Sequence, residues 1–224
     1  MSASPSAQLV LLPGVGGDTR QFAPQRAEFP DLVVPPWIAP TRHETLDSYA
    51  VRFAQQLALH GPVVLGGSSF GGMVAYEMAR HIHPKAVVLI GSCRSRRAIL
   101  PSLHVVRPIA RWIPSRIFDL GKPISPFIVG RLSRLPSDER RLCAGMLKDD
   151  DSRFMHWACN AILRWHPQSS PQTRVLHIHG RRDHIIPAKR VDADEIVPDG
   201  GHLINLTHPR LVNAFLRRVL KDVS

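Results

Sequence analysis

The sequence predicts an α/β fold in which a mostly parallel sheet of about six strands is covered by helices on both faces. Short apolar runs bounded by Pro and Gly indicate strands that are buried on both sides. Segments with helical spacing separate these runs, as the crossovers between parallel strands require. One long stretch breaks the alternation and indicates a helical insertion.

The expected strands follow one another along most of the chain. The first run, Q-L-V-L-L, ends at Pro13-Gly14, and the second ends at Pro35-Pro36. The runs are nearly continuous in apolar character, which is typical of strands in a sheet with two covered faces. They are Gln8–Leu12, Asp31–Val34, Pro62–Leu65, Lys85–Ile90, Arg174–Ile178 and Glu195–Val197.

Helical spacing marks the segments between and after these strands. Tyr49, Phe53 and Leu57 recur at intervals of four residues and predict one buried helix face. The chain closes with an amphipathic segment of the same kind. The expected core helices are Thr45–His60, Ser69–His81 and Leu211–Lys221.

The alternation of strands and helices stops in the middle of the chain. Five prolines, from Pro101 to Pro126, precede two helical stretches near 137–147 and 152–165, and no strand pattern occurs there. We therefore expect residues 93–166 to form a helical cap over the end of the sheet. The core is expected in residues 1–92 and 167–224.

Length and composition fit one domain. The chain has 224 residues, of which 44% are hydrophobic. No apolar run is long enough to span a bilayer, and the start, M-S-A-S-P-S-A, lacks the features of a secretory signal. Cys93, Cys143 and Cys159 form no C-x-x-C pair, so neither a disulfide framework nor a zinc site is expected. These features fit a reducing cytoplasm.

The formal net charge of +11 is concentrated in the middle of the chain. Residues 92–166 contain 14 Lys and Arg against 6 Asp and Glu, whereas the remainder contains 15 against 12. Such a segment can meet an anionic partner, and a solvated arginine-rich surface explains it equally well. No nucleic-acid-binding motif is present, so nucleic acid is not expected as a partner.

A candidate nucleophile lies between an expected strand and an expected helix. The stretch Gly67-Ser68-Ser69-Phe70-Gly71 matches G-x-S-x-G in one frame only, with Ser69 at the centre. Glycines at these positions allow close backbone approach around a sharp turn that holds the serine out from the chain. The pattern alone is also compatible with an ordinary glycine-rich turn, so further groups are needed.

The loop Pro13-Gly14-Val15-Gly16-Gly17 follows the first expected strand. Acyl transfer through a serine creates a negatively charged oxygen that needs backbone N–H donors. We expect these donors to be Phe70, directly after Ser69, and Val15, with Gly16 as the alternative. A dinucleotide-binding loop is the competing interpretation, but threonine stands where G-x-G-x-x-G requires its last glycine.

A serine nucleophile needs a base, and the base needs an acid to orient it. Twelve histidines make residue type alone uninformative, so position after a strand decides. Asp183 follows one expected strand, and His202 follows the next, after two glycines. The weaker alternatives are His184, His208, Asp192, Asp194 and Asp199.

Three separated motifs, P-G-V-G-G, G-S-S-F-G and G-R-R-D followed by G-G-H, together resemble the α/β-hydrolase superfamily. The resemblance covers nearly the whole chain and implies Ser69 as nucleophile, His202 as base and Asp183 as acid. Compared with the usual pattern of the superfamily, we expect the two leading antiparallel strands to be absent. The chain also has only 18 residues between Asp183 and His202, and it has Pro13 where a histidine is common.

These observations predict a serine hydrolase that cleaves a small-molecule carboxylic ester through an acyl-enzyme, with no metal or organic cofactor. Lyase chemistry and C–C bond hydrolysis on the same residues stay open. The cap is expected to wall the acyl pocket. The substrate-binding candidates are Gly14, Trp112, Phe118 and Trp157.

The basic cap suggests a more specific alternative, a thioesterase or methyl-ester esterase that acts on substrates held by an acidic acyl carrier protein. The resemblance supports this alternative, because the superfamily includes enzymes of that kind. A rival of another class is a non-catalytic binder of anionic partners, which leaves the three motifs unexplained. The arginines considered for carrier docking are Arg94, Arg96, Arg97, Arg107, Arg111, Arg131, Arg134, Arg140 and Arg141.

Overall fold

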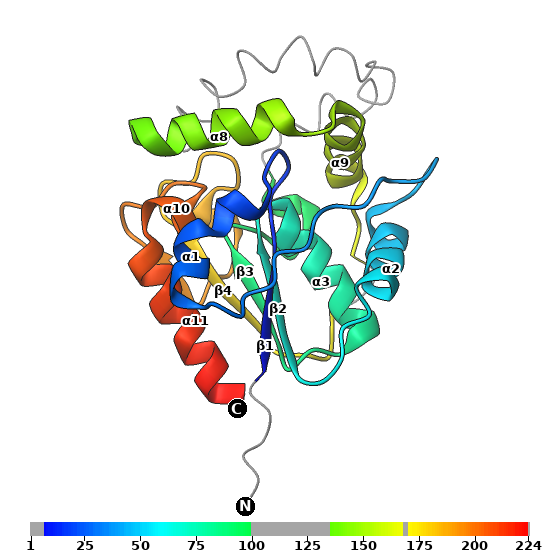
Figure 1. Ribbon diagram of the computed structural model, residues 1–224, viewed down its shortest axis with the longest axis horizontal. Helices are drawn as coiled ribbons and strands as arrows, with labels where there is room; N and C mark the ends of the chain where they lie inside the picture. Colours follow the sequence, from blue (N-terminus) through cyan, green and yellow to red (C-terminus); the bar gives the residue numbers. More distant parts are fainter. Residues whose placement is uncertain (1–6, 100–134, 168–169, 224) are drawn as a thin grey trace, which may run out of the picture.

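A parallel sheet forms the centre of the molecule, as the computed structural model shows for residues 7–99, 135–167 and 170–223 (Figure 1). Its five strands lie side by side in chain order, and every neighbouring pair is parallel. The predicted α/β class is therefore confirmed. The strands are β1 (Gln8–Leu12), β2 (Val63–Ser68), β3 (Ala86–Ile90), β4 (Val175–Gly180) and β5 (Glu195–Val197).

The run predicted as a further strand, Asp31–Val34, forms only an isolated parallel bridge beside β1. Val33 pairs with Val10, its N–H donates to Leu9 at 3.0 Å, and its carbonyl accepts from Leu11 at 2.9 Å. Proline has no N–H to continue such a ladder, and two prolines follow at once. The sheet thus has five strands and one bridge in place of about six strands.

Both faces of the sheet are covered. Side chains of β1 alternate between the faces, so that Val10 and Leu12 join one buried cluster while Leu9 and Leu11 join the other. Helices α2 (Leu46–Leu57) and α3 (Phe70–Ile82) cover the first face. Helix α11 (Pro209–Val223) packs on the second, beside α1 (Ala23–Glu28) (Figure 1).

Two helices of the expected cap, α8 (Ser137–Asp149) and α9 (Ser152–Arg164), lie across the carboxyl ends of the strands (Figure 1). Arg20 donates a hydrogen bond to Asp149 of α8 at 2.8 Å, which ties this helix to the loop after β1. Trp112 and Phe118, which the sequence analysis expects in the cap, lie outside the described residues, as do Arg107, Arg111, Arg131 and Arg134.

Short elements complete the loops at the same end of the sheet. The sequence patterns did not predict them, because a single turn shows no periodicity. They are η1 (Thr19–Phe22), η2 (Arg96–Ala98), η3 (Ala188–Arg190) and α10 (Ile204–Thr207).

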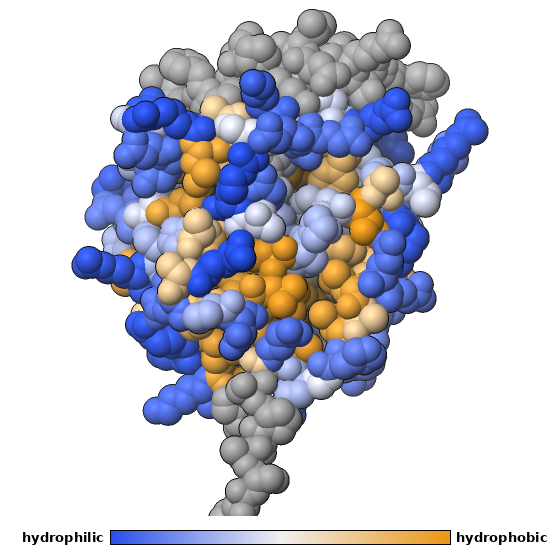
Figure 2. Space-filling view, viewed as in Figure 1, coloured by the Kyte–Doolittle hydropathy of each residue, from blue (hydrophilic) through white to orange (hydrophobic). Residues whose placement is uncertain are grey.

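On the face viewed in Figure 2, hydrophobic residues gather near β1 and hydrophilic residues surround them. Within the described part of the chain, no helix has the length and apolar character needed to cross a membrane.

Candidate active site

Ser69 occupies a strained turn between β2 and α3. Its φ of 52° lies in the left-handed region, which non-glycine residues adopt only where the surroundings impose it. A side chain at Gly71 would place its Cβ 2.1 Å from the carbonyl oxygen of Leu12, and one at Gly67 would lie 2.4 Å from Gly71 itself. The glycines on either side of Ser69 are therefore required by close backbone packing.

The structure brings together the three residues proposed from sequence as nucleophile, base and acid. His202 Nε2 lies 2.8 Å from Ser69 Oγ, and His202 Nδ1 lies 2.7 Å from Asp183 Oδ2. Asp183 and His202 are both buried. Because a carboxylate only accepts hydrogen bonds, Nδ1 carries the imidazole proton and Nε2 is left free to accept the Ser69 hydroxyl proton.

Asp183 is held from both sides. Its Oδ1 accepts hydrogen bonds from the backbone N–H groups of Ile185 and Ile186, at 2.8 and 2.9 Å. Burial acts to raise the pKa of this carboxyl, but the nearby His202 and hydrogen bonds from His179 and His202 outweigh it, so that the pKa falls below its usual range. Asp183 is consequently ionised at neutral pH.

Two expected oxyanion donors flank Ser69. Phe70 begins α3, where the first N–H groups have no partner within the helix. Val15 lies in the loop after β1, and within the described residues its N–H makes no hydrogen bond. The N–H of Gly14, by contrast, donates to Gln21 Oε1 at 2.8 Å. A Cβ placed on Gly14 would lie 3.5 Å from that of Ser69, so this glycine packs against the proposed nucleophile.

A buried histidine pair stands behind Asp183, and sequence analysis missed it. His179 Nε2 lies 2.8 Å from the carbonyl of Ile186 and 3.3 Å from Asp183 Oδ2, so it carries a proton. Its Nδ1 faces His177 Nε2 at 3.1 Å, and His177 Nδ1 faces the Asp192 carbonyl at 3.3 Å. Burial, with the adjacent imidazole of His179 and the positive charge of Arg94, lowers the pKa of His177 to about 3. The H-x-H spacing on β4 was the available signal, because alternate residues of a strand share a face.

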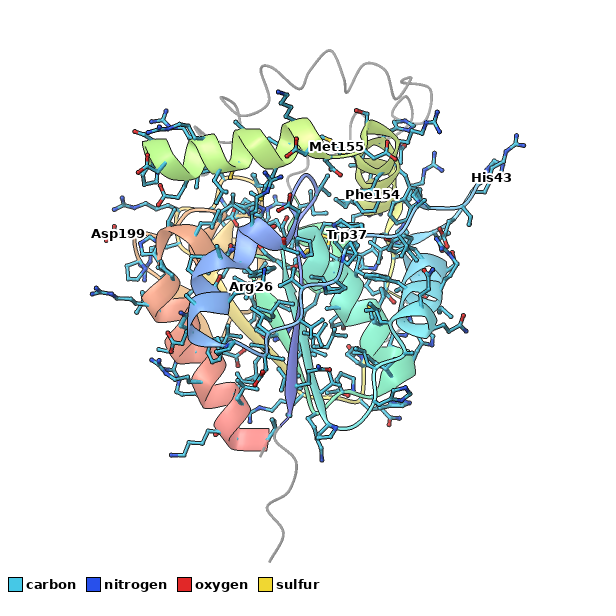
Figure 3. The ribbon with its side chains drawn as sticks, in the orientation of Figure 1. Arg26, Trp37, His43, Phe154, Met155 and Asp199 are labelled. Atoms are coloured by element: carbon cyan, nitrogen blue, oxygen red, sulfur yellow. The ribbon has the colours of Figure 1, made fainter. Side chains whose placement is uncertain are left out.

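Trp157, a predicted substrate-binding residue, belongs to an aromatic cluster under α9. Its ring centre lies 4.4 Å from that of Tyr49, and its Nε1 donates to the Glu44 carbonyl at 2.9 Å. Phe154, also on α9, stacks on Trp37 with ring centres 5.4 Å apart (Figure 3). Trp157 also lines a cavity of about 490 Å³ between α9 and the start of α2.

The weaker acid and base candidates lie elsewhere. His184 is exposed. His208 contacts the hydroxyl of Thr207 at 2.8 Å. Asp199 pairs with Arg182 at 2.5 Å. Among the described residues, no group of three or more His, Cys, Asp or Glu side chains is arranged to hold a metal ion.

Comparison with known proteins assigns the chain to a family. The model described as "Alpha/beta hydrolase family" matches residues 9–215. The chain belongs to this family. No curated protein sequence matches this alpha/beta hydrolase.

Solved structures resemble this alpha/beta hydrolase over nearly its whole length. A thermophilic esterase has 18% identity and a TM-score of 0.70, with 99% of this chain and 92% of that one covered. MenH from S. aureus has 16% identity and a TM-score of 0.76, with 99% and 96% covered. An epoxide hydrolase from Bacillus megaterium has 11% identity and a TM-score of 0.74, with 99% and 95% covered. At these identities the likeness concerns the fold alone.

Proposed function

We propose that this protein is a serine hydrolase that cleaves carboxylic esters through an acyl-enzyme intermediate. The observation that carries the proposal is the continuous hydrogen-bond path from Ser69 Oγ through His202 to the ionised Asp183, with links of 2.8 and 2.7 Å. Membership of the alpha/beta hydrolase family and the esterase fold among the similar structures support it.

In the proposed first step, Ser69 Oγ attacks the ester carbonyl while His202 Nε2 takes the hydroxyl proton. Asp183 keeps the imidazole in the required tautomer and stabilises the imidazolium that forms. The N–H groups of Val15 and Phe70 receive the developing oxyanion, and each such donor contributes about 3 kcal/mol of transition-state stabilisation. His202 then returns the proton to the leaving alkoxide.

In the second step, His202 takes a proton from water, which attacks the carbonyl of the acyl-enzyme. The bond to Ser69 Oγ then breaks, His202 returns the proton to this oxygen, and the acid is released. Both steps use the same oxyanion and proton-transfer groups, so neither calls for an organic cofactor.

The proposal predicts turnover of short-chain p-nitrophenyl esters, with a burst of p-nitrophenol where deacylation is the slower step. A chain-length series from acetate to octanoate measures this and also reports the size of the acyl site. Activity on no ester of the series, together with no covalent labelling by an organophosphate, would favour a non-catalytic binder of anionic partners.

A carrier-linked thioester or methyl ester is the second candidate substrate, favoured by the charge excess of residues 92–166. Five of the arginines considered for carrier docking lie among the described residues. Two of them, Arg97 and Arg140, are exposed, and neither forms an ion pair with another described residue. Three others are engaged with their own chain: Arg94 donates to Val175, Arg96 to Leu163 and Arg141 to Asp138.

For this candidate we expect kcat/KM to be higher for a carrier-linked ester than for the same free ester. The value for the carrier-linked ester should fall as salt rises from 0.05 to 0.5 M, where the electrostatic screening length is about 4 Å. The double variant Arg97→Gln/Arg140→Gln should reduce the carrier preference and leave free-ester turnover intact. Equal, salt-independent rates on both substrates would exclude carrier docking.

A further inference from the structure

One buried side-chain amide contacts the loops that hold the proposed catalytic groups. Asn205 is fully buried in α10, three residues after His202. Its Nδ2 donates to the backbone carbonyl of Gln21 at 2.7 Å. Its Oδ1 faces the hydroxyl of Ser68, the neighbour of the nucleophile, at 3.5 Å. The first of these contacts is a strong hydrogen bond, and the second lies at the limit of one.

Gln21 extends this connection to the oxyanion loop. The residue is buried, and its Oε1 accepts the N–H of Gly14 at 2.8 Å, directly before Val15. A Cβ at Gly17 would lie 2.2 Å from the same oxygen, so the loop is folded closely around this amide. The side chain of Gln21 therefore binds the loop of Gly14 and Val15, while the backbone carbonyl of Gln21 is bound by the side chain of Asn205.

The geometry gives these bonds a consequence for catalysis. Leaving a buried carbonyl or N–H group without a hydrogen-bond partner costs about 1–3 kcal/mol of folding free energy. The side-chain amides of Asn205 and Gln21 are therefore favoured in the positions that keep their partners bonded. Asn205 lies three residues after His202 in the chain, and Gln21 is hydrogen-bonded to the loop that contains Val15. A shift of either loop relative to the other breaks the 2.7 Å bond.

We propose that Asn205 and Gln21 are positioning residues, which set the distance between the histidine loop, the Ser69 turn and the oxyanion loop. The inference rests on the proposed ester hydrolysis. Neither side chain touches substrate. Their part is to keep the Val15 N–H aimed at the position of the oxyanion.

The test uses Asn205→Leu and Gln21→Met, which keep side-chain size and remove the polar contacts. Asn213→Leu is the matched control, since Asn213 is also buried and its Nδ2 donates to Glu28 at 2.9 Å. Its Oδ1 accepts from Gln25 Nε2 at 3.0 Å, and in the control Gln25 keeps its separate bond to the Asn205 carbonyl, at 3.0 Å. Both test variants should lower kcat/KM for a p-nitrophenyl ester by roughly 10²-fold, the effect of an ångström-scale misplacement, with KM nearly unchanged. The control should stay within about twofold for a similar loss of folding stability.

Affinity for a trifluoromethyl ketone separates positioning from a general loss of structure. Ser69 adds to this ketone and forms a tetrahedral oxyanion, so its Kd should rise in parallel with the fall in kcat/KM in both test variants. Should Asn205→Leu fail to fold, Gln21→Met, which leaves α10 intact, decides. Wild-type kcat/KM and ketone affinity in Gln21→Met would overturn the proposal.

Amide hydrogen exchange at Gly14, followed by NMR, tests the connection without reference to activity. We expect the protection of this N–H to fall in Asn205→Leu and to be unchanged in Asn213→Leu. Unchanged protection in Asn205→Leu would overturn the coupling even in an active enzyme. Reduced protection in a protein that hydrolyses no ester would instead uphold the coupling and refute the ester hydrolase.

Discussion

Replacing Ser69 with alanine is expected to lower kcat for ester hydrolysis by on the order of 10⁶-fold, because the variant has no nucleophile and the base has no proton to take. Alanine keeps the Cβ and the backbone, so the turn with its φ of 52° should persist. Initial rates on p-nitrophenyl acetate, with thermal unfolding of both proteins, measure the loss at equal folding.

Ser68→Ala is the matched comparison. The two serines are adjacent, but Ser68 is buried and its hydroxyl has one contact at 3.5 Å, to Asn205. Losing a hydrogen bond this weak should cost at most about tenfold in kcat/KM. Mass spectrometry after labelling with diethyl p-nitrophenyl phosphate should locate the adduct on Ser69. An adduct on Ser68, or full activity in Ser69→Ala, would refute the assignment of the nucleophile.

The strands could be predicted from sequence because their signal is local. Q-L-V-L-L is apolar after its first residue and is followed by a proline, and β1 has the same bounds. Asp31–Val34 shows the limit of that signal, since an apolar run of equal quality pairs at only one residue when prolines follow it. Whether an apolar segment forms a strand depends on how many of its backbone N–H groups are available to hydrogen-bond to the adjacent strand.

The proposed nucleophile, acid and base could also be found locally, because each follows a strand and is marked by glycines. The groups around them could not. Gln21 and Asn205 lie 184 positions apart in sequence, and no sequence pattern around either residue predicts the hydrogen bond between them. No sequence pattern singles out His179, because twelve histidines make the residue type alone uninformative. Its role against Asp183 is defined by the fold of the loop that carries Ile186.

Asp183→Asn is expected to lower kcat by about 10⁴-fold at pH 7 while leaving the protein folded. The backbone N–H groups of Ile185 and Ile186 point at one side-chain oxygen, at 2.8 and 2.9 Å. In the variant these backbone donors must face the amide oxygen, because the amide NH₂ group is itself a donor and cannot accept a hydrogen bond from them. The amide NH₂ then takes the place of Oδ2 and faces His202 Nδ1.

That orientation reverses the tautomer of the base. Nδ1 of His202 would accept from the amide, and Nε2 would carry the proton and donate it toward Ser69 Oγ, which lies 2.8 Å away. An imidazole in this state cannot remove the serine proton. The carboxylate that would stabilise the imidazolium is lost at the same time.

Asp199→Asn is the matched control for this change, because Asp199 lies on the loop that leads to His202 and pairs with Arg182 in an exposed ion pair. Loss of such a pair is usually worth less than about 0.5 kcal/mol, so kcat should stay within about twofold. Steady-state kinetics of the two variants, with KM for the same ester, separate the effects. If Asp183→Asn retained kcat within tenfold of the wild type, Asp183 would not orient the base, and the short segment between Asp183 and His202 would have to place another acceptor against Nδ1.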